Sequence, residues 1–482
     1  MSRWAGRLRI ALILLVLVLA TYLPVIITGY IDIRRGDDAL RHADYVARTI
    51  HQLSADDFAS AAAYYRSAAR KLPWKPELLE QAAGPMSHVN EDEALSLFEK
   101  AGQRGVLSAE GWDAYGFQYW STSRDQQALE IWKTGLERYP SHYQFYSSMH
   151  LAYRRLGDYS AEQLSLEKWL DTGEGTAFDH YELGELLMAS DPNRARAQLR
   201  QAASMDTELA DAVQTLDASL ALAALEKSPS GRLVILGRGL GLVNDWGLGQ
   251  YNFQQAVNAD PHNAEAWAWL GEALQHNGKD GKAALDKALE LDPNSTLVHA
   301  LRGLYWKRQG KYEAELAEYQ KTAQIEPENP EWQVALGEAY ALSGDLVSGL
   351  AAYQKATSLA PANPVYWRML ASFCADNGVQ LTEIGLPAAR KAVQLAPDDP
   401  QAVDALGWAF AQAGLLYNAE ETLNKATSLA PDSALPHLHL AETYLRKGDQ
   451  SGALGELKLA QQLDPGGATG TLAAQLIRQY FP

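Results

Sequence analysis

Cysteine is almost absent from this sequence. Cys374 is the single cysteine among 482 residues, so the chain can form no internal disulfide and no cysteine-based zinc or iron–sulfur site. Cys374 falls at a core position of a helical pattern, the seventh residue after Trp367. We therefore expect a buried, unreactive thiol rather than a nucleophile.

Positive charge is also scarce. The chain has 42 lysines and arginines against 59 aspartates and glutamates, a net charge of −17, and no long basic run. A chain of this charge is repelled by phosphate unless it carries a local basic patch. The composition argues against a nucleic-acid partner. Because 47% of the residues are hydrophobic, it also argues against a disordered chain.

Motifs that carry chemistry are missing or have a simpler interpretation. The glycines of 237–241 lack the preceding strand and the spacing of a nucleotide-binding loop. His437 and His439 are two residues apart, so on a helix they point to different faces and cannot share a metal ion. No Ser–His–Asp order and no paired-carboxylate arrangement stands out. We expect no enzymatic activity and no cofactor.

A long hydrophobic run occurs at the N-terminus. The 22 residues from Ile10 to Ile31 contain no charge, and as a helix they span about 33 Å, enough to cross a hydrocarbon core of about 30 Å. No clear cleavage site follows the run. We predict a single-pass anchor that contacts the lipid bilayer through residues 10–31. A cleaved signal peptide and a buried globular helix are the alternatives.

The charges around this run leave its orientation open. Three arginines precede it and three follow closely, so lysine and arginine counting gives a tie. The short N-terminal tail favours an N-terminus inside the cell. We expect the rest of the chain on the extracytoplasmic side of the cell membrane; the cytoplasmic side is the alternative.

The remainder of the chain repeats with a period of about 34 residues. Within the unit that starts at Pro400, apolar or small residues from Val403 to Phe410 have the spacing of one helix face, and Ala419, Leu423 and Ala426 form a second such face. Gly414 separates the two. Prolines recur at intervals of 32 to 36 residues in similar phrases: Pro261, Pro293, Pro327, Pro361, Pro397, Pro431 and Pro465.

Small residues recur in phase with these prolines. A small side chain allows the two helices of one hairpin to approach closely. On the first helix the position holds Gly237, Gly271, Gly303, Gly337, Ala371, Gly407 and Ala441. On the second helix it holds Ala256, Ala288, Thr322, Ala356, Ala392, Ala426 and Ala460.

The segment Trp267-Ala-Trp-Leu-Gly-Glu-Ala-Leu274, followed by Lys287-Ala-Leu-Glu-Leu-Asp-Pro293, resembles a tetratricopeptide repeat. Seven units between about 230 and 467 share the pattern, and more divergent units precede them. The resemblance implies an all-α fold: a right-handed α-solenoid of about twelve helix-turn-helix repeats, preceded by a single transmembrane helix.

These patterns divide the chain into five parts. We expect a tail and anchor at 1–35, a divergent repeat array at 36–205, a joint at 206–229, a regular array at 230–467 and a capping helix at 468–482. The joint contains an extra apolar helix, Val213 to Leu225, and breaks the period. We expect the array to bend there.

The resemblance also implies where partners bind. In this family the first helices line a concave groove. Matching positions carry aromatic and charged residues: Arg154, Arg155, Tyr181, Glu185, Trp269, Glu272, Lys307, Arg308, Arg368 and Trp408. The lysine–asparagine clamp that some members use is absent, because Arg368 and Ser372 occupy one such pair of positions. Phe117 and Trp120 also fall on the groove side and form a candidate aromatic patch. Solvated helix faces are the alternative for each residue.

We expect a membrane-anchored scaffold or assembly factor that binds proteins or peptides in this groove. A bacterial cell-envelope process such as export, complex assembly or surface-polymer synthesis fits an anchor followed by repeats. A chaperone-like receptor for extended clients is one alternative. A non-catalytic regulatory subunit of a glycosyltransferase or polymer ligase is another. The oligomeric state has no signal in the sequence.

Overall fold

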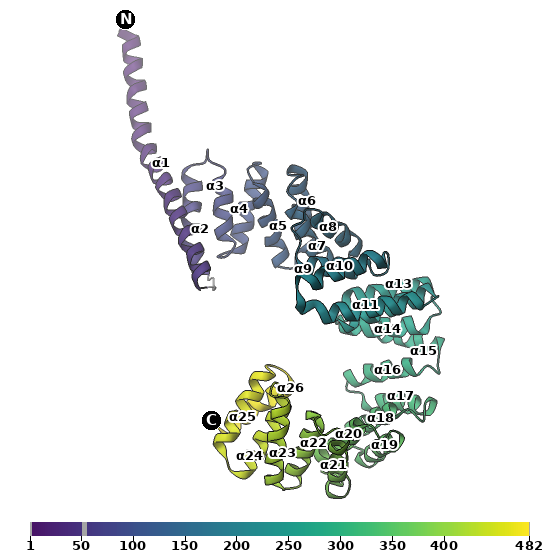
Figure 1. Cartoon of the computed structure of the whole chain (residues 1–482). Coiled ribbons are helices and arrows are strands. Elements are labelled where there is room, and N and C mark those ends of the chain that lie inside the picture. The colour runs from purple at the N-terminus through teal and green to yellow at the C-terminus, as the bar shows by residue number, and fades with distance from the viewer. Residues whose placement is uncertain (1, 51–54, 482) are drawn as a thin grey trace. The chain divides into compact units, whose positions relative to one another are not determined.

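The protein is built from helices. The computed structural model describes residues 2–50 and 55–481, and within them it has 26 α-helices and no strand. Consecutive helices pack as antiparallel hairpins, and within each compact unit neighbouring hairpins stack on one another (Figure 1). The all-helical repeat fold predicted from the sequence is confirmed.

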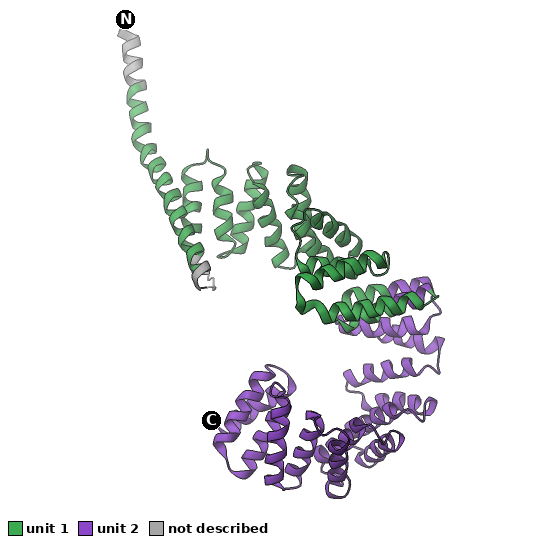
Figure 2. Cartoon of the chain, viewed as in Figure 1, with its two compact units in different colours: residues 1–228, 235–252 green, residues 229–234, 253–482 purple. Residues whose placement is uncertain are grey.

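The chain divides into two compact units (Figure 2). Unit 1 comprises residues 1–228 and 235–252, and unit 2 comprises residues 229–234 and 253–482. Two helices have residues in both units: α12 (Pro229–Leu242) and α13 (Trp246–Ala259). The division thus falls after the segment 206–229 that we predicted as a joint, and a bend there stays a prediction.

Unit 1 contains four hairpins after its first helix pair. Its helices are α1 (Ser2–Ile50), α2 (Ala55–Lys71), α3 (Leu78–Met86), α4 (Glu91–Gln103), α5 (Ala109–Ser121), α6 (Asp125–Arg138), α7 (Gln144–Leu156), α8 (Tyr159–Leu170), α9 (Ala177–Leu187), α10 (Pro192–Met205) and α11 (Ala210–Leu225). Contacts pair α1 with α2, α3 with α4, α5 with α6, α7 with α8 and α9 with α10. Helix α11 lies where the sequence predicted an extra helix, and it contacts α10 and α12.

Unit 2 has six hairpins and a final single helix. They are α14 (Ala264–His276) with α15 (Lys282–Leu291), α16 (Thr296–Arg308) with α17 (Tyr312–Ile325), α18 (Pro330–Ser343) with α19 (Leu346–Leu359), α20 (Pro364–Asn377) with α21 (Leu386–Leu395), α22 (Pro400–Gln412) with α23 (Leu416–Leu429), and α24 (Ala434–Lys447) with α25 (Gln450–Leu463). The last helix, α26 (Ala468–Tyr480), packs on α25 and covers the end of the array.

Glycine and proline set the ends of the helices. Three first helices begin with proline at the first turn, at Pro330, Pro364 and Pro400, where a missing N–H costs nothing. Gly344 and Gly448 end their helices in the left-handed conformation that glycine adopts without strain. The glycines and prolines that recur about every 34 residues in the sequence thus lie at or near helix ends.

Small residues close the hairpins as predicted. A Cβ atom on Gly407 would lie 2.6 Å from Leu423, and one on Gly303 would lie 2.7 Å from Tyr319 of the paired helix. The matching second-helix residues, such as Ala426 and Thr322, are fully buried. The small residues that recur in the sequence therefore lie where the two helices of a hairpin are in close contact.

The connection between α20 and α21 is longer than those of the other unit 2 hairpins and contains a π-helical turn, Leu381–Gly385. Its last residue packs against Cys374, so closely that a Cβ added to Gly385 would lie 2.7 Å from the Cys374 Cβ. Cys374 is fully buried, and burial raises its pKa to about 11. The expectation of a buried thiol is confirmed, and its lack of reactivity stays a prediction.

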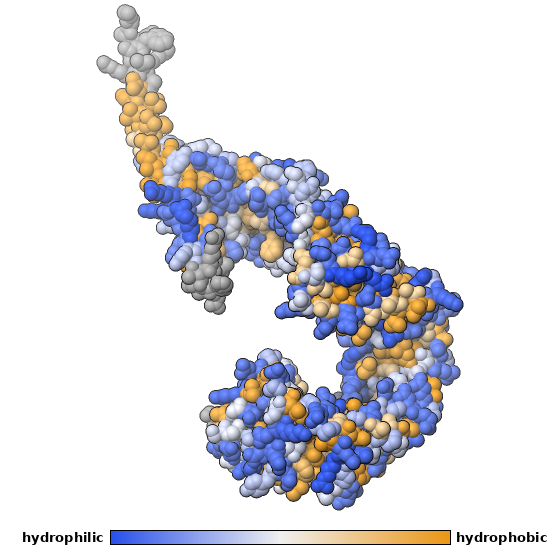
Figure 3. Space-filling model, in the orientation of Figure 1, coloured by the Kyte–Doolittle hydropathy of each residue, from blue (hydrophilic) through white to orange (hydrophobic). Residues whose placement is uncertain are grey.

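The apolar run and the first repeat share one helix. Within the described residues, one helix is long and apolar enough to cross a membrane, Leu12–Val46. Its first, apolar part projects from the packed helices as a hydrophobic rod (Figure 3). The helix does not end at residue 35, where we predicted the boundary of the anchor, but continues as the first helix of the α1–α2 hairpin.

Candidate functional site

Three first helices of unit 2 line an open cavity of about 690 Å³. Arg368, Ser372 and Asp376 come from α20, Asp404 and Trp408 from α22, and His439 and Glu442 from α24. Apolar side chains complete the wall: Ala405, Leu435, Pro436, Leu438 and, from α26, Leu472. This groove contains two of the residues predicted from the sequence, Arg368 and Trp408.

Trp408 is the fixed centre of this groove. Its indole N–H donates to Asp376 Oδ1 at 2.8 Å, and its ring stacks on His439 with centroids 4.3 Å apart. His439 Nδ1 in turn lies 2.9 Å from Asp404 Oδ1. These bonds join α20, α22 and α24, and the Trp408 side chain is only 8% exposed. Trp408 therefore shapes the groove more than it offers an exposed ring.

Arg368 and Glu442 are two further charged residues of the cavity wall. Arg368 Nε is buried and has no hydrogen-bond partner among the described residues. Burial raises the pKa of the Glu442 carboxyl, and the nearby His439 and Arg446 offset part of this rise. A buried N–H without a partner is costly. Arg368 as a whole is only half-buried and lines the cavity, so its guanidinium can donate to a ligand carbonyl or carboxylate.

Other predicted groove residues of unit 2 join neighbouring repeats. Arg308 on α16 forms a two-pronged ion pair with Glu272 on α14, with Nη1 2.7 Å from Oε2. Lys307 Nζ lies 2.6 Å from Glu338 on α18. Trp269 stacks on Phe253 with centroids 6.1 Å apart. Their first role is to connect repeats.

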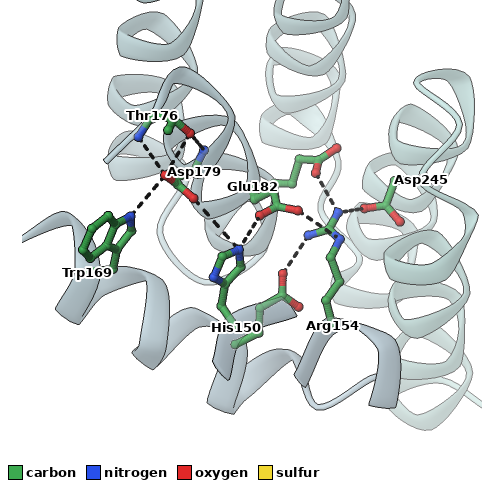
Figure 4. A network of polar contacts seen from close by, with 9 residues as sticks. His150, Arg154, Trp169, Thr176, Asp179, Glu182 and Asp245 are labelled. Atoms are coloured by element: carbon green, nitrogen blue, oxygen red, sulfur yellow. Dashed lines mark hydrogen bonds and ion pairs between the residues drawn. The ribbon is translucent and has the colours of Figure 1, made fainter. Parts of the chain in front are cut away.

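In unit 1, Arg154 is the centre of a buried charge network (Figure 4). From α7, its guanidinium lies 2.7 Å from Glu162 on α8 and 3.3 Å from Glu182 on α9. It also lies 3.2 Å from Glu185 on α9 and 2.6 Å from Asp245 before α13. One cation thus faces four carboxylates, and three of these are almost fully buried.

This surplus of negative charge changes the protonation of the network. Burial raises the pKa of Glu162 to about 7 and, together with the nearby Asp245, that of Glu185 to about 8. Arg154 opposes both shifts. Tyr181 hydrogen-bonds Glu185. Burial is the main cause that raises the pKa of the Tyr181 phenol, and the Glu185 carboxylate adds to it. Two predicted groove residues, Tyr181 and Glu185, therefore belong to the interior of unit 1.

A second part of the network surrounds His150. Its Nε2 lies 3.3 Å from Glu182 and 3.9 Å from Asp179, and one ligand atom from each of the three residues falls within 4.8 Å of the others. Asp179 also accepts from Trp169 and Thr176 (Figure 4). A histidine with two carboxylates can hold a divalent metal ion. His150 Nδ1 and Glu182 Oε2 are buried and have no hydrogen-bond partner among the described residues.

The predicted aromatic patch is divided between surface and core. Phe117 is 50% exposed and lines a shallow cavity between α3 and α5, whereas Trp120 packs against the core of unit 1. Arg155 lies over the Trp120 ring, 4.6 Å from its centroid, and pairs with Asp125. Phe117 is the member of this pair that a partner can contact.

Sequence reasoning missed the partners of the groove residues. Asp376 pairs with Trp408 across 32 residues, Asp404 with His439 across 35, and Glu272 with Arg308 across 36. These separations are all close to one repeat. A search for complementary residues one period apart would have found them, whereas Asp245 is 91 residues from Arg154 and has no such signal.

Comparison with known proteins agrees with the repeat pattern. Residues 243–296, 307–364 and 400–433 match models of the tetratricopeptide repeat. A human protein O-mannosyl-transferase, TMTC1, is 25% identical over 202 residues, which are 41% of this chain and 23% of that protein. The peroxisomal targeting signal receptor of Komagataella phaffii is 51% identical over 45 residues, 9% of this chain and 8% of that receptor. The chain spans less than a quarter of either relative.

Several solved structures are partly similar to this chain. Yeast Tom70 is 14% identical to this chain. The alignment covers 92% of this chain and 95% of the Tom70 chain, with a TM-score of 0.41. Cut9–Hcn1 of the APC/C is 12% identical, covering 93% of this chain and 97% of that one, with a TM-score of 0.38. MamA from Desulfovibrio magneticus RS-1 is 22% identical. The alignment covers 39% of this chain and 97% of the MamA chain, with a TM-score of 0.29.

Hairpins closed by small residues, a period of about 34 residues and three matched segments agree with one another. Residues 243–296, 307–364 and 400–433 are therefore tetratricopeptide repeats, and the chain also has an apolar N-terminal helix.

Proposed function

We propose that the protein is a membrane-anchored scaffold that binds an extended segment of a partner protein in the groove of α20, α22 and α24. The observation that carries this proposal is the open cavity in which a rigid Trp408–His439 stack lies among apolar side chains, with the Arg368 Nε–H unpaired among the described residues. An apolar wall with a few oriented polar groups is typical of a binding site.

The groove chemistry indicates the kind of segment. Leu435, Leu438 and Leu472 supply an apolar surface for one hydrophobic side chain. Arg368 supplies a donor for a backbone carbonyl or a carboxylate, which an arginine binds with two N–H groups. We infer an extended segment that pairs one apolar side chain with an acidic group.

The apolar part of α1 supports the membrane role. Its side chains from Leu12 to Val25 are exposed, and a contiguous exposed surface of this kind needs an apolar cover. An anchor raises the effective concentration of the groove toward any other membrane protein. We place the protein in a bacterial cell-envelope process such as export, complex assembly or surface-polymer synthesis, with the repeats on the extracytoplasmic side.

Two alternatives predict different binding behaviour. A chaperone-like receptor accepts many unrelated extended segments, whereas a scaffold selects one sequence pattern. A regulatory subunit of a glycosyltransferase or polymer ligase co-purifies with that enzyme. The second alternative is supported by the similarity to a relative named protein O-mannosyl-transferase.

A peptide-display selection against the full-length protein tests the groove. We expect enriched peptides to share a pattern, and we expect Arg368→Glu to weaken their binding at least about tenfold, the loss of one charge-assisted contact. Lys458→Glu on α25 makes the same charge change outside the cavity and should leave binding unaltered. Equal effects of the two variants would refute the groove as the site.

A further inference from the structure

Protein begins to cover the apolar part of α1 before that part ends. Every described side chain from Leu12 to Val25 is exposed. Burial starts at Ile26 and continues at Gly29, Asp32 and Gly36. Residues three or four apart lie on one face of a helix. One face of α1 is therefore buried by protein from Ile26 onward, while the others stay open.

Helix α2 covers this face and runs antiparallel to α1. Gly36 faces the Tyr65 ring, and the Asp32 carboxylate accepts from Ser67 Oγ at 2.7 Å and pairs with Lys71 Nζ at 2.6 Å. At the end of α2, Leu72 packs on Gly29, where an added Cβ would lie 2.7 Å from Leu72 Cγ. The turn that follows α2 therefore lies beside residues 26–29 of α1.

Along the axis of α1, the α2–α3 turn (residues 72–77) therefore lies at the level of the last residues of the uncharged stretch 10–31. The rise from residue 26 to residue 31 is about 7 Å. A bilayer that ended at residue 25 would leave 16 uncharged residues, about 24 Å, short of the hydrocarbon core of about 30 Å. If the whole stretch is in the membrane, the turn lies at the boundary between acyl chains and headgroups.

The side chains at this level suit that boundary. Trp74 in the turn is 55% exposed, and Tyr30 on α1 is also exposed with Lys75 Nζ 5.6 Å from its ring centroid. Tryptophan and tyrosine are enriched at membrane interfaces. Asp32 is the first charge after the apolar run, and it is buried in its pair with Lys71.

The local charge is opposite to that of the whole chain. Beside the turn and the end of the apolar run lie two acidic residues, Asp32 and Glu77, and five basic residues: Arg34, Arg35, Arg70, Lys71 and Lys75. The next acidic residues of α1, Asp37 and Asp38, bind Tyr65 and Arg41, and the net charge of the whole chain is −17. Lys71 and Lys75 have acidic neighbours, whereas Arg34, Arg35 and Arg70 are exposed. Basic clusters beside a membrane helix attract anionic headgroups.

The geometry points to a second membrane-contact site at the α2–α3 turn. Trp74 enters the headgroup–acyl boundary beside Tyr30, and Arg34, Arg35, Arg70 and Lys75 bind the phosphates of anionic phospholipids. The first hairpin is then held against the bilayer, and α1 does not act as a free stalk. This inference rests on the proposed membrane anchor.

Depth measurements on the full-length protein in vesicles test it. In a Cys374→Ala background, an environment-sensitive fluorophore is attached at one of three positions: Trp74→Cys in the turn, Leu19→Cys in the apolar run, or Val89→Cys in the α3–α4 turn. Val89 is exposed, and its turn follows Met86 at the other end of α3. The vesicles are phosphatidylcholine with or without phosphatidylglycerol, and a nitroxide-labelled lipid is the quencher.

We expect quenching and a blue shift at positions 19 and 74 and neither at 89. We also expect phosphatidylglycerol to increase quenching at 74, and Arg70→Glu with Lys75→Glu to remove that increase. Quenching at 19 with a water-exposed signal at both 74 and 89 would overturn the second contact while the anchor stands. A water-exposed signal at 19 would overturn the anchor and the second contact together.

Discussion

Arg154 and Asp245 are 91 residues apart in the chain, and their side chains meet inside unit 1 with Nη2 2.6 Å from Oδ2. Glu162, Glu182 and Glu185 surround the same guanidinium. Because these residues come from α7, α8, α9 and the α12–α13 turn, a single side chain holds consecutive repeats of unit 1 together.

Removal of this cation should loosen unit 1. We expect Arg154→Met to lower its unfolding free energy by about 3 kcal/mol, because it leaves buried carboxylates without a counter-charge. Hydrogen exchange of α7 to α10 in the full-length protein measures the loss. The matched control is Arg155→Met, whose partly exposed pair with Asp125 should cost no more than about 1 kcal/mol. Equal protection of these helices in both variants would contradict a central role for Arg154.

The same network should make unit 1 sensitive to alkaline pH. Burial raises the pKa of Glu162 to about 7 and that of Glu185 to about 8, from an unfolded value near 4.5. The native state then binds more protons than the unfolded state over this range, so stability falls as the pH rises from about 4.5 to about 8. Hydrogen exchange of α8 and α9, corrected for the intrinsic rate at each pH, should show lower protection at pH 8 than at pH 6.

Glu185→Gln separates this effect from general alkaline destabilisation. The amide cannot ionise, so the variant should show a shallower fall in protection with rising pH. An unchanged slope would show that Glu185 does not carry the proton.

A pair of glycine substitutions tests how the hairpins close. Gly407→Ala places a Cβ 2.6 Å from Leu423, so we expect a loss of about 1–3 kcal/mol from overpacking. Gly455→Ala in α25 meets nothing within 4 Å and should stabilise that helix by about 0.5–1 kcal/mol. Thermal unfolding of the two variants should therefore move in opposite directions. A loss of stability in both would show that the close approach is not what requires glycine at 407.

The fold was accessible from the sequence because each hairpin repeats the same local chemistry. Glycine at 271, 303, 337 and 407 and proline at regular intervals mark close helix contacts and helix ends, and both signals lie within one period. The continuation of α1 past residue 35 was not predicted. Its buried face, with Asp32 paired to Lys71 across 39 residues, becomes apparent only when α2 lies against it.

The candidate site was predicted less well than the fold. Position in the repeat identified Arg368 and Trp408, and the structure brings both to one cavity. The same rule selected Arg154, Tyr181, Glu185 and Glu272, which the structure engages in contacts with neighbouring helices. A repeat position specifies the face of a helix, but a long charged side chain on that face can reach the next repeat before it reaches a partner.

Site-specific crosslinking in intact cells tests the central claim, that a partner segment lies in the groove of α20, α22 and α24. A photoreactive amino acid replaces Ser372 inside the cavity or Lys458 on α25 outside it. We expect a discrete crosslinked partner from position 372, lost when Arg368→Glu is added, and none from position 458. Crosslinks from 458 alone, or crosslinks from 372 that persist with Arg368→Glu, would contradict it.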